Sequence, residues 1–139
     1  MSPSTCTLGR RQALALLSAF GVPASALAQD AVRADPRGYA LLFENERLRV
    51  LEYTSRPGMG ICGQGVHSHP AHLNIALTPI KARVRLPDGN FIVAENKAGD
   101  VFWEEAVTHS VENIGGAGAR AYMIELKDAA PARAPRPST

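Results

Sequence analysis

Between residues 39 and 126, apolar and polar residues alternate in short runs that are separated by turn-forming residues. Alternation of this kind is typical of β-strands with one buried face, because successive side chains of a strand point to opposite sides. The clearest run is KARVRL at residues 81–86, where the apolar residues are expected to face inward and the basic residues to face solvent. No stretch keeps a helical period over the roughly ten residues that a helix needs. The pattern therefore predicts an all-β protein.

Proline, glycine and asparagine mark the ends of the expected strands. The sequence PDGN at residues 87–90 favours a tight hairpin, and the glycine-rich residues 115–118 separate the last two strands. About eight strands at this spacing, with no helical crossover between them, favour a closed sandwich or a small barrel. The strands that the pattern resolves cover residues 47–54, 72–78, 81–86, 90–95, 101–104, 106–113 and 119–126.

The start of the chain differs from this central region. It contains Arg10 and Arg11, then an apolar run too short to span a bilayer, and then an Ala-Leu-Ala sequence before Gln29. This order is typical of an export signal peptide, and the paired arginines with Leu14 resemble a twin-arginine signal. The mature protein is therefore expected to be periplasmic or secreted. The expected organisation is an export signal peptide at 1–28, an N-terminal linker at 29–38, one β-barrel domain at 39–128 and a disordered tail rich in proline and alanine at 129–139.

Removal of the signal peptide changes the charge of the chain. The full sequence has 15 basic and 13 acidic residues, a formal net charge of +2. Arg10 and Arg11 lie in the signal peptide and all 13 acidic residues follow it, so the mature chain is near neutral. A near-neutral chain is not expected to bind nucleic acid or an anionic membrane surface.

Three of the four histidines fall within six residues, in the sequence HSHPAH at 67–72. In an extended strand, His67 and His69 project from the same face, close enough together to hold one metal ion. The fourth histidine, His109, lies far along the chain and can join them only through the fold. A metal site is thus a hypothesis that depends on tertiary structure.

The direction of His72 and Asn74 stays open at this point. Counting by twos from His69 places Leu73 on the same face as that histidine, and His72 and Asn74 on the opposite face. A bulge at Pro70 would reverse this assignment and turn His72 and Asn74 inward, where either could complete the site.

Two segments together resemble the motifs of the cupin superfamily. HSHP at residues 67–70 is similar to the HxH motif, and the strand opened by Gly99, with His109 and Asn113 after it, is similar to the second motif. The resemblance covers most of residues 39–126. It implies a small single-domain cupin, a jelly-roll barrel of the double-stranded β-helix type, in which His67, His69 and His109 are three metal ligands.

One residue of the usual cupin pattern is missing. Cupins commonly carry a glutamate three or four residues after the second histidine, where this chain has Leu73 and Asn74. A set of three neutral histidines leaves the charge of the ion uncompensated, which favours anionic chelating ligands and lowers the pKa of bound water. His72 and Asn74 are the candidates for an additional ligand or for a contact just outside the ligands.

The resemblance implies one divalent transition metal, which could be Fe, Zn, Ni, Cu or Mn. Its first implication for activity is a non-haem iron dioxygenase that acts on a small chelating substrate. The alternatives are a metal-dependent isomerase or lyase, for which His72 is the nearest base in the sequence, and a non-enzymatic module that binds metal or a small ligand. Family habit and the unpaired edge strands of an open barrel also predict a homodimer.

Overall fold

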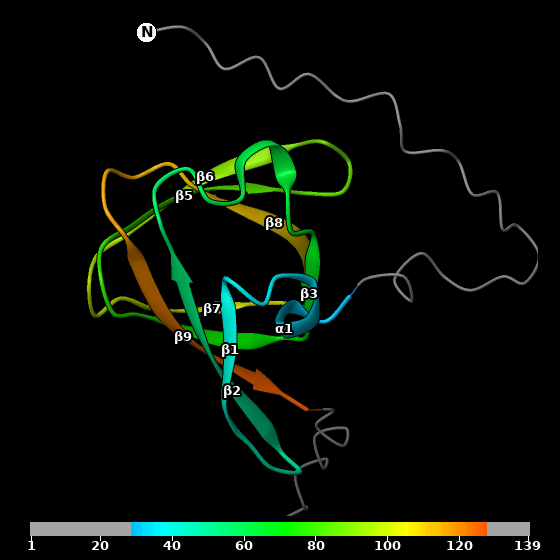
Figure 1. Cartoon of the computed structure of the whole chain (residues 1–139). Coiled ribbons are helices and arrows are strands. Elements are labelled where there is room, and N and C mark those ends of the chain that lie inside the picture. The colour runs from blue at the N-terminus through cyan, green and yellow to red at the C-terminus, as the bar shows by residue number, and fades with distance from the viewer. Residues whose placement is uncertain (1–28, 128–139) are drawn as a thin grey trace, which may run out of the picture.

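The computed structural model describes residues 29–127, so the expected signal peptide at 1–28 and the expected tail at 129–139 lie outside the described residues. Within this range, nine strands form two sheets that face each other and curve into a barrel (Figure 1). The strands are β1 (Tyr39–Glu44), β2 (Leu48–Ser55), β3 (His67–His69), β4 (His72–Ala76), β5 (Ile80–Arg85), β6 (Phe91–Asn96), β7 (Val101–Glu104), β8 (Val107–Asn113) and β9 (Ala119–Leu126).

The five-stranded sheet has the order β1-β2-β9-β4-β7, and the four-stranded sheet has the order β3-β8-β5-β6. Every pairing between these strands is antiparallel. The prediction of an all-β jelly-roll barrel is therefore confirmed. None of the helices within residues 29–127 is long and apolar enough to cross a membrane.

Two strands have no clear signal in the sequence. In β1 only Tyr39 is buried and the next five residues are exposed, so the strand lacks the alternation of a half-buried strand. It is held instead by its pairing with β2 along the edge of the sheet. The other strand, β3, is three residues long, which is too short for a periodic pattern.

The apolar core lies between the two sheets, on the inner faces of β2 and β9. Alternate residues of β9 are buried from Ala119 onward, in agreement with the expected strand at 119–126. The core cluster consists of Ala31, Tyr39, Leu51, Tyr53, Ala119, Ala121 and Met123.

The segment expected to be a linker, residues 29–38, contains a short helix α1 (Ala31–Ala34) that lies beside β3 (Figure 1). The Asp30 carboxylate caps this helix by accepting a hydrogen bond from Val32 N at 3.1 Å. The Ser68 amide donates to the Gln29 carbonyl at 2.9 Å. The first described residues are thus attached to the strand that carries His67 and His69.

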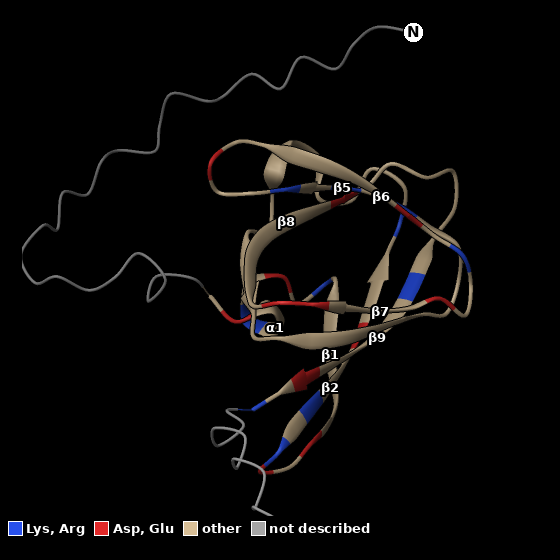
Figure 2. Cartoon of the chain, turned by 180° about the vertical axis from the view of Figure 1, so that it is seen from behind, with Lys and Arg blue, Asp and Glu red and all other residues tan. Residues whose placement is uncertain are grey.

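The basic stripe of β5 is only partly in solvent. Lys81 is exposed as expected, but Arg83 and Arg85 converge on the carboxylate of Glu112 from β8, at 3.1 and 3.6 Å. Figure 2 shows basic positions on β5 and an acidic position on β8, the strand beside it. Both guanidinium groups also lie over the ring of Phe91, at 5.3 and 5.6 Å from its centroid. The prediction that the basic residues face solvent therefore holds only in part for the two arginines, whose side chains are 31% exposed, because Glu112 arrives on the same face from a strand far along the chain.

A glycine-rich loop between β2 and β3 packs against the end of β8. It contains a short 3-10 helix, η2 (Ile61–Gly63), and its backbone bonds Asn113 through Gly58 N and Met59 O at 2.8 and 2.9 Å. Gly60 has a φ of 80°, and a Cβ there would lie 1.9 Å from the Val111 carbonyl oxygen. Only glycine fits this close approach of two backbones.

We expect Gly60→Ala to lower the free energy of unfolding by about 2–4 kcal/mol, through the left-handed backbone and the clash with Val111. Gly58→Ala is the matched control, because Gly58 has a φ of 79° but no atom within 4 Å of a Cβ. Its cost should be the backbone contribution alone, about 1–2 kcal/mol. Urea unfolding of the three proteins measures the difference, and equal losses would contradict the close packing of this loop.

Candidate metal centre

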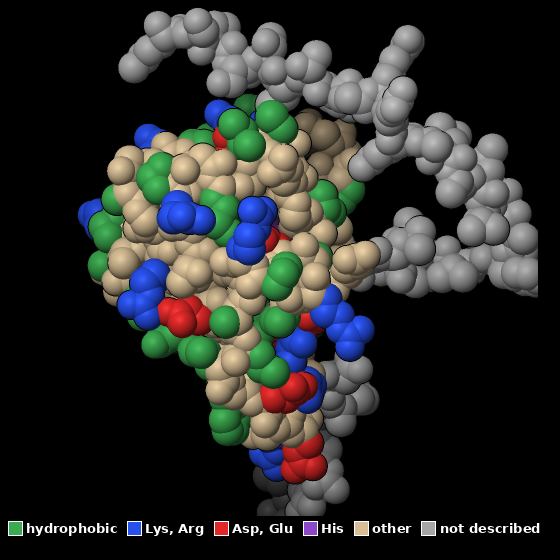
Figure 3. Space-filling view, in the orientation of Figure 1, with side chains coloured by type: hydrophobic (Ala, Val, Ile, Leu, Met, Phe, Trp, Pro, Cys, Tyr) green, Lys and Arg blue, Asp and Glu red, His purple; other side chains and the backbone are tan. Residues whose placement is uncertain are grey.

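Polar side chains fill the barrel next to β3 and β8. The largest fully buried side chains are Leu51, His67, His72, Glu125 and Asn74, so four of these five are polar. His67, His69 and His109 are 1%, 3% and 3% exposed, and no histidine is visible on the face drawn in Figure 3. Buried polar groups at this density are costly unless they are paired, which points to a site rather than to a simple core.

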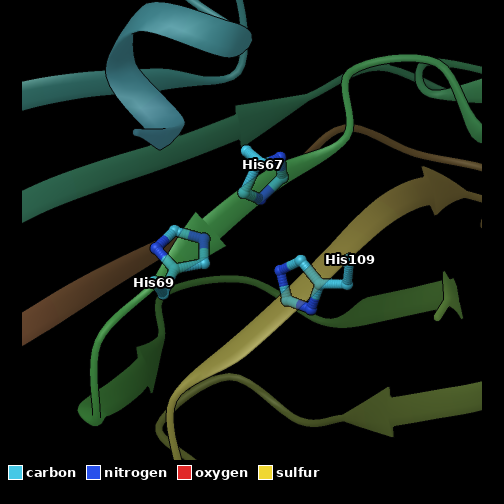
Figure 4. A group of neighbouring side chains, drawn as sticks. All are labelled: His67, His69 and His109. Carbon is cyan, nitrogen blue, oxygen red and sulfur yellow. The ribbon is translucent and has the colours of Figure 1, made fainter. Parts of the chain in front are cut away.

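The pairing of β3 with β8 brings the three histidines together (Figure 4). His67 lies directly opposite His109 in the ladder, so their side chains project from the same face. His69 projects from that face two residues further along β3. Their ring centroids are 4.8–5.3 Å apart. The structure thus joins His109 to the two histidines that the sequence placed on one face.

Some nitrogen atoms of these rings make hydrogen bonds within the protein, and the others have no partner and are called open here. His67 Nδ1 donates to the Gly65 carbonyl at 2.6 Å, and His69 Nδ1 donates to Glu125 Oε1 at 2.6 Å. The Nε2 atoms of His67 and His69, and both ring nitrogens of His109, are buried without a hydrogen-bond partner within residues 29–127. A proton fixed on Nδ1 leaves the lone pair on Nε2, which is how metal-binding histidines are usually oriented.

The spacing of these nitrogens fits one metal ion. One ligand nitrogen from each ring can be chosen so that all three lie within 4.8 Å of one another. Two metal–nitrogen bonds of about 2.1 Å span at most about 4.2 Å, so the nitrogens lie slightly wider apart than one bound ion would hold them.

Electrostatics keeps two of the three rings in their neutral form. Burial lowers the pKa of His67 to about 4, aided by the charge of a protonated His69 and opposed by the hydrogen bond to the Gly65 carbonyl. Burial likewise lowers the pKa of His109 to about 3, together with the charges of His67 and His69. Both imidazoles are therefore neutral at pH 7, and neutral imidazole is the form that binds a metal.

His72 and Asn74 point into the barrel. Of the two alternatives left open by the sequence, the one in which both residues face inward is therefore correct. β3 ends at His69 and β4 begins at His72 in the opposite sheet, and the exposed Pro70 makes the break. His72 and Asn74 are 0% and 2% exposed. Counting alternate residues from His69 gives the wrong face for His72 and Asn74, because the chain passes from one sheet to the other between β3 and β4. The alternation of inward and outward side chains therefore starts anew in β4.

Both nitrogens of His72 are already engaged. Nδ1 donates to the Pro70 carbonyl at 2.7 Å, and Nε2 donates to Glu104 Oε2 at 3.0 Å. Burial alone would lower the pKa of His72, but these two hydrogen bonds and the charge of Glu104 raise it above its usual value. A ring that donates from both nitrogens has no lone pair for a metal. In this arrangement, His72 acts on Glu104 rather than on an ion.

Two carboxylates lie beside the histidines, and the sequence did not single out either of them. Glu104 accepts hydrogen bonds from His72 and from Asn74 Nδ2, each at 3.0 Å. The bond from His72 lowers the pKa of Glu104 below its usual range, so this carboxylate is ionised. Strand alternation carried a signal for both acids, because Glu104 shares a face with Phe102 and Glu125 shares a face with Met123.

Glu125 links the cluster to the protein surface. It is 1% exposed, and its second oxygen accepts from Arg49 Nη2 at 2.6 Å and from Arg49 Nε at 2.9 Å. Arg49 in turn pairs with Asp30 at 2.6 Å. Burial would raise the pKa of Glu125, but the bonds from His69 and Arg49 lower it below its usual value. The row of charges from Asp30 through Arg49 and Glu125 thus fixes the ring of His69.

A cavity of about 70 Å³ adjoins the cluster. Its polar walls include His109, Glu104 and Asn74, and its other walls are mainly apolar residues such as Val84, Phe102 and Met123. It shares Ile80 and Asn96 with a larger groove of about 500 Å³ on the surface. His109, whose two ring nitrogens are open, therefore lies beside a space that suits a small, largely apolar ligand.

The fold and the cluster together define a double-stranded β-helix with a buried three-histidine centre. Among solved structures, the chain is similar to a cupin domain from Bordetella pertussis Tohama I, with 23% identity and a TM-score of 0.57 over 73% of this chain and 97% of that one. A protein from Bacillus halodurans matches with 17% identity and a TM-score of 0.50 over 68% of this chain and 73% of its own.

An RmlC-like cupin family protein with a double-stranded β-helix fold, from Methanocaldococcus jannaschii, matches with 12% identity and a TM-score of 0.48 over 66% of this chain and 83% of its own. No family model and no curated protein matches the sequence. The match to the Bordetella pertussis cupin domain, together with the two antiparallel sheets, shows that the chain has the cupin fold, as the two motifs implied.

We expect Arg49→Met to weaken metal binding about 10-fold or more, because Glu125 loses the partner that orients it toward His69. The change keeps most of the apolar stem of the side chain. Arg120→Met is the matched control, since Arg120 pairs with Glu52 on the outer face of the same sheet and lies away from the histidines. Competition with a chelator of known affinity measures both variants, and equal affinities would show that Arg49 has no role in orienting His69.

Proposed function

We propose that this protein is an exported metalloprotein that holds one divalent transition metal through His67, His69 and His109, and that it acts as a dioxygenase on a small chelating substrate. The observation that carries the proposal is the group of buried ring nitrogens without partners. Imidazole ligands suit Fe, Zn, Ni and Cu, and Mn is also accepted by such sites. When bound, the ion would supply Lewis-acid chemistry and, in the case of iron, redox chemistry.

The protein's own residues favour an anionic chelating ligand. Three neutral imidazoles do not offset the charge of a divalent ion, so an anionic ligand beside them gains electrostatic energy. The walls of the cavity are mainly apolar, and low polarity strengthens this attraction. Glu104 lies at the edge of the cavity as an ionised carboxylate and can accept the proton that a chelating substrate releases.

Metal analysis tests the site directly. The purified protein should bind close to one equivalent of a divalent metal, and His67→Ala or His109→Ala should reduce the bound metal more than 10-fold, because each removes one of three ligands. His72→Gln is the control, since both nitrogens of His72 are engaged elsewhere, and it should keep the stoichiometry. Negligible metal in the wild-type protein would end the proposal.

Oxygen consumption tests the activity. The iron-loaded protein should consume oxygen with a member of a panel of diketones, phenols and thiols, and the same protein with zinc should not, because zinc has no redox chemistry. An oxygen electrode records both rates. Turnover of the substrate at the same rate without oxygen would exclude a dioxygenase.

A metal-dependent isomerase or lyase is the second candidate. The observation that favours it is Glu104, an ionised carboxylate that His72 and Asn74 hold beside the cavity. Such chemistry needs a base near the metal, and this carboxylate is better placed for that role than His72, which already donates from both nitrogens. Product formation in the absence of oxygen distinguishes this candidate from the first.

The proposal also includes export and a homodimer. The protein isolated from the periplasm should have the intact mass of a chain that begins at Gln29, because the Ala-Leu-Ala sequence before it suits a signal peptidase.

The edge strands β1 and β6 carry exposed apolar residues, among them Phe43 and Ile92, at 53% and 57% exposure, and such edges favour association. Light scattering on the same sample should give twice the mass of one chain, and the mass of a single chain would reject the dimer.

A further inference from the structure

The hydroxyl of Tyr39 is a buried polar group that the fold leaves without a partner. Tyr39 opens β1 and is 3% exposed. Its hydroxyl oxygen has no hydrogen-bond partner within residues 29–127. Buried hydroxyl groups are nearly always bonded, because an unmet one has lost its water and gained nothing in return. Phenylalanine would fill nearly the same volume without this cost. The hydroxyl is therefore expected to bond a partner outside the described residues, such as a ligand.

A neighbouring tyrosine shows what a purely structural hydroxyl does in this barrel. The ring of Tyr53 lies 5.2 Å from that of Tyr39, and Tyr53 is also buried. The hydroxyl of Tyr53, however, is hydrogen-bonded to Ser55. Within the same cluster of rings, one tyrosine is satisfied by the protein and the other is not.

Tyr39 lies beside the three-histidine centre and in the wall of the neighbouring cavity. Its ring centroid is 4.6 Å from that of His67 and 5.2 Å from that of His69. It also lines the 70 Å³ cavity that His109 and Glu104 border. A molecule that fills this cavity and reaches the open nitrogens would therefore pass the side chain of Tyr39.

Tyr39 and Glu104 are two polar groups of the cavity wall with complementary chemistry. A phenol keeps its proton at neutral pH and can donate it. Glu104 is ionised and can only accept. Tyr39 is therefore a donor in this wall that no group of the described residues uses, and it can stabilise a ligand oxygen carrying negative or partial negative charge.

We propose that Tyr39 recognises the ligand of this centre by donating its hydroxyl hydrogen to a carbonyl or carboxylate-type oxygen, and that the ligand is a small molecule with an apolar body and such an oxygen at the end nearest the histidines. The proposal rests on the metal site proposed above. It adds a specificity-determining residue and a class of ligand to that site.

Acetohydroxamate and imidazole test the proposal on the cobalt-loaded protein. The two probes have the same number of heavy atoms, but acetohydroxamate binds a metal through oxygen and imidazole through nitrogen. In Tyr39→Phe, the dissociation constant of acetohydroxamate, followed by the visible absorption of cobalt, should rise about 3- to 10-fold, the range expected for one lost hydrogen bond. The dissociation constant of imidazole should stay unchanged.

Tyr122→Phe is the matched control, because this substitution also removes one phenol hydroxyl, but on the outer face of β9. It should leave both dissociation constants unchanged. Tyr39→Phe should also unfold at the same temperature as the wild-type protein or at a higher one, since it removes a hydroxyl with no partner. A clear drop in that temperature would assign the hydroxyl to folding and overturn the proposal.

The remaining outcomes separate this proposal from the metal site itself. Wild-type protein that takes up no cobalt overturns the metal site and the role of Tyr39 with it. Cobalt uptake with equal weakening of both probes shows that Tyr39 only shapes the cavity, and cobalt uptake with no weakening shows that it meets only water. Either of these last two results overturns the role of Tyr39 and leaves the metal site intact.

Discussion

The direct pairing of His67 with His109 across β3 and β8 is the constraint on which the site depends. A shift of one residue in this register would turn one of the two rings to the outside of the barrel, because strand side chains alternate in facing. The loop from β2 packs against the far end of β8 through Gly60 and ends at Gly65, whose carbonyl holds His67. The register, the loop and the ring orientation are therefore coupled.

Among the described residues, as many polar or charged residues as hydrophobic ones are buried, and the protein offsets most of this cost by pairing. Glu125 joins His69 to Arg49 and Asp30, and Glu104 joins His72 to Asn74. Each carboxylate is ionised and each is satisfied by donors from other strands. Within residues 29–127, the buried polar side-chain atoms without partners include Nε2 of His67 and of His69, both ring nitrogens of His109 and the hydroxyl of Tyr39, which lie in one part of the barrel. The others are the Nε atoms of Arg83 and Arg85, whose guanidinium groups already pair with Glu112. A group of buried polar atoms that lack partners and lie together is the physical mark of a binding site.

The two acids also change how the missing cupin glutamate is understood. No acid follows the histidines along β4, but Glu104 on β7 pairs directly with His72, and Glu125 on β9 pairs with the same residue from the other side. Negative charge is thus supplied to the centre by β7 and β9, the two strands that lie on either side of β4. It acts on the orientation of the rings and on the wall of the cavity, because each carboxylate is held by partners of its own.

The sequence by itself determined the all-β class, most strand positions and the common face of His67 and His69, because alternation and turn residues are local properties of the chain. It also carried the two motifs that identified the fold. Only the tertiary structure decided the rest. Whether His72 and Asn74 face inward depends on the change of sheet at Pro70, and whether Arg83 meets solvent depends on Glu112. The partners of His69 and the open hydroxyl of Tyr39 arise from residues far apart in the chain, and no local pattern specifies which strands will lie side by side.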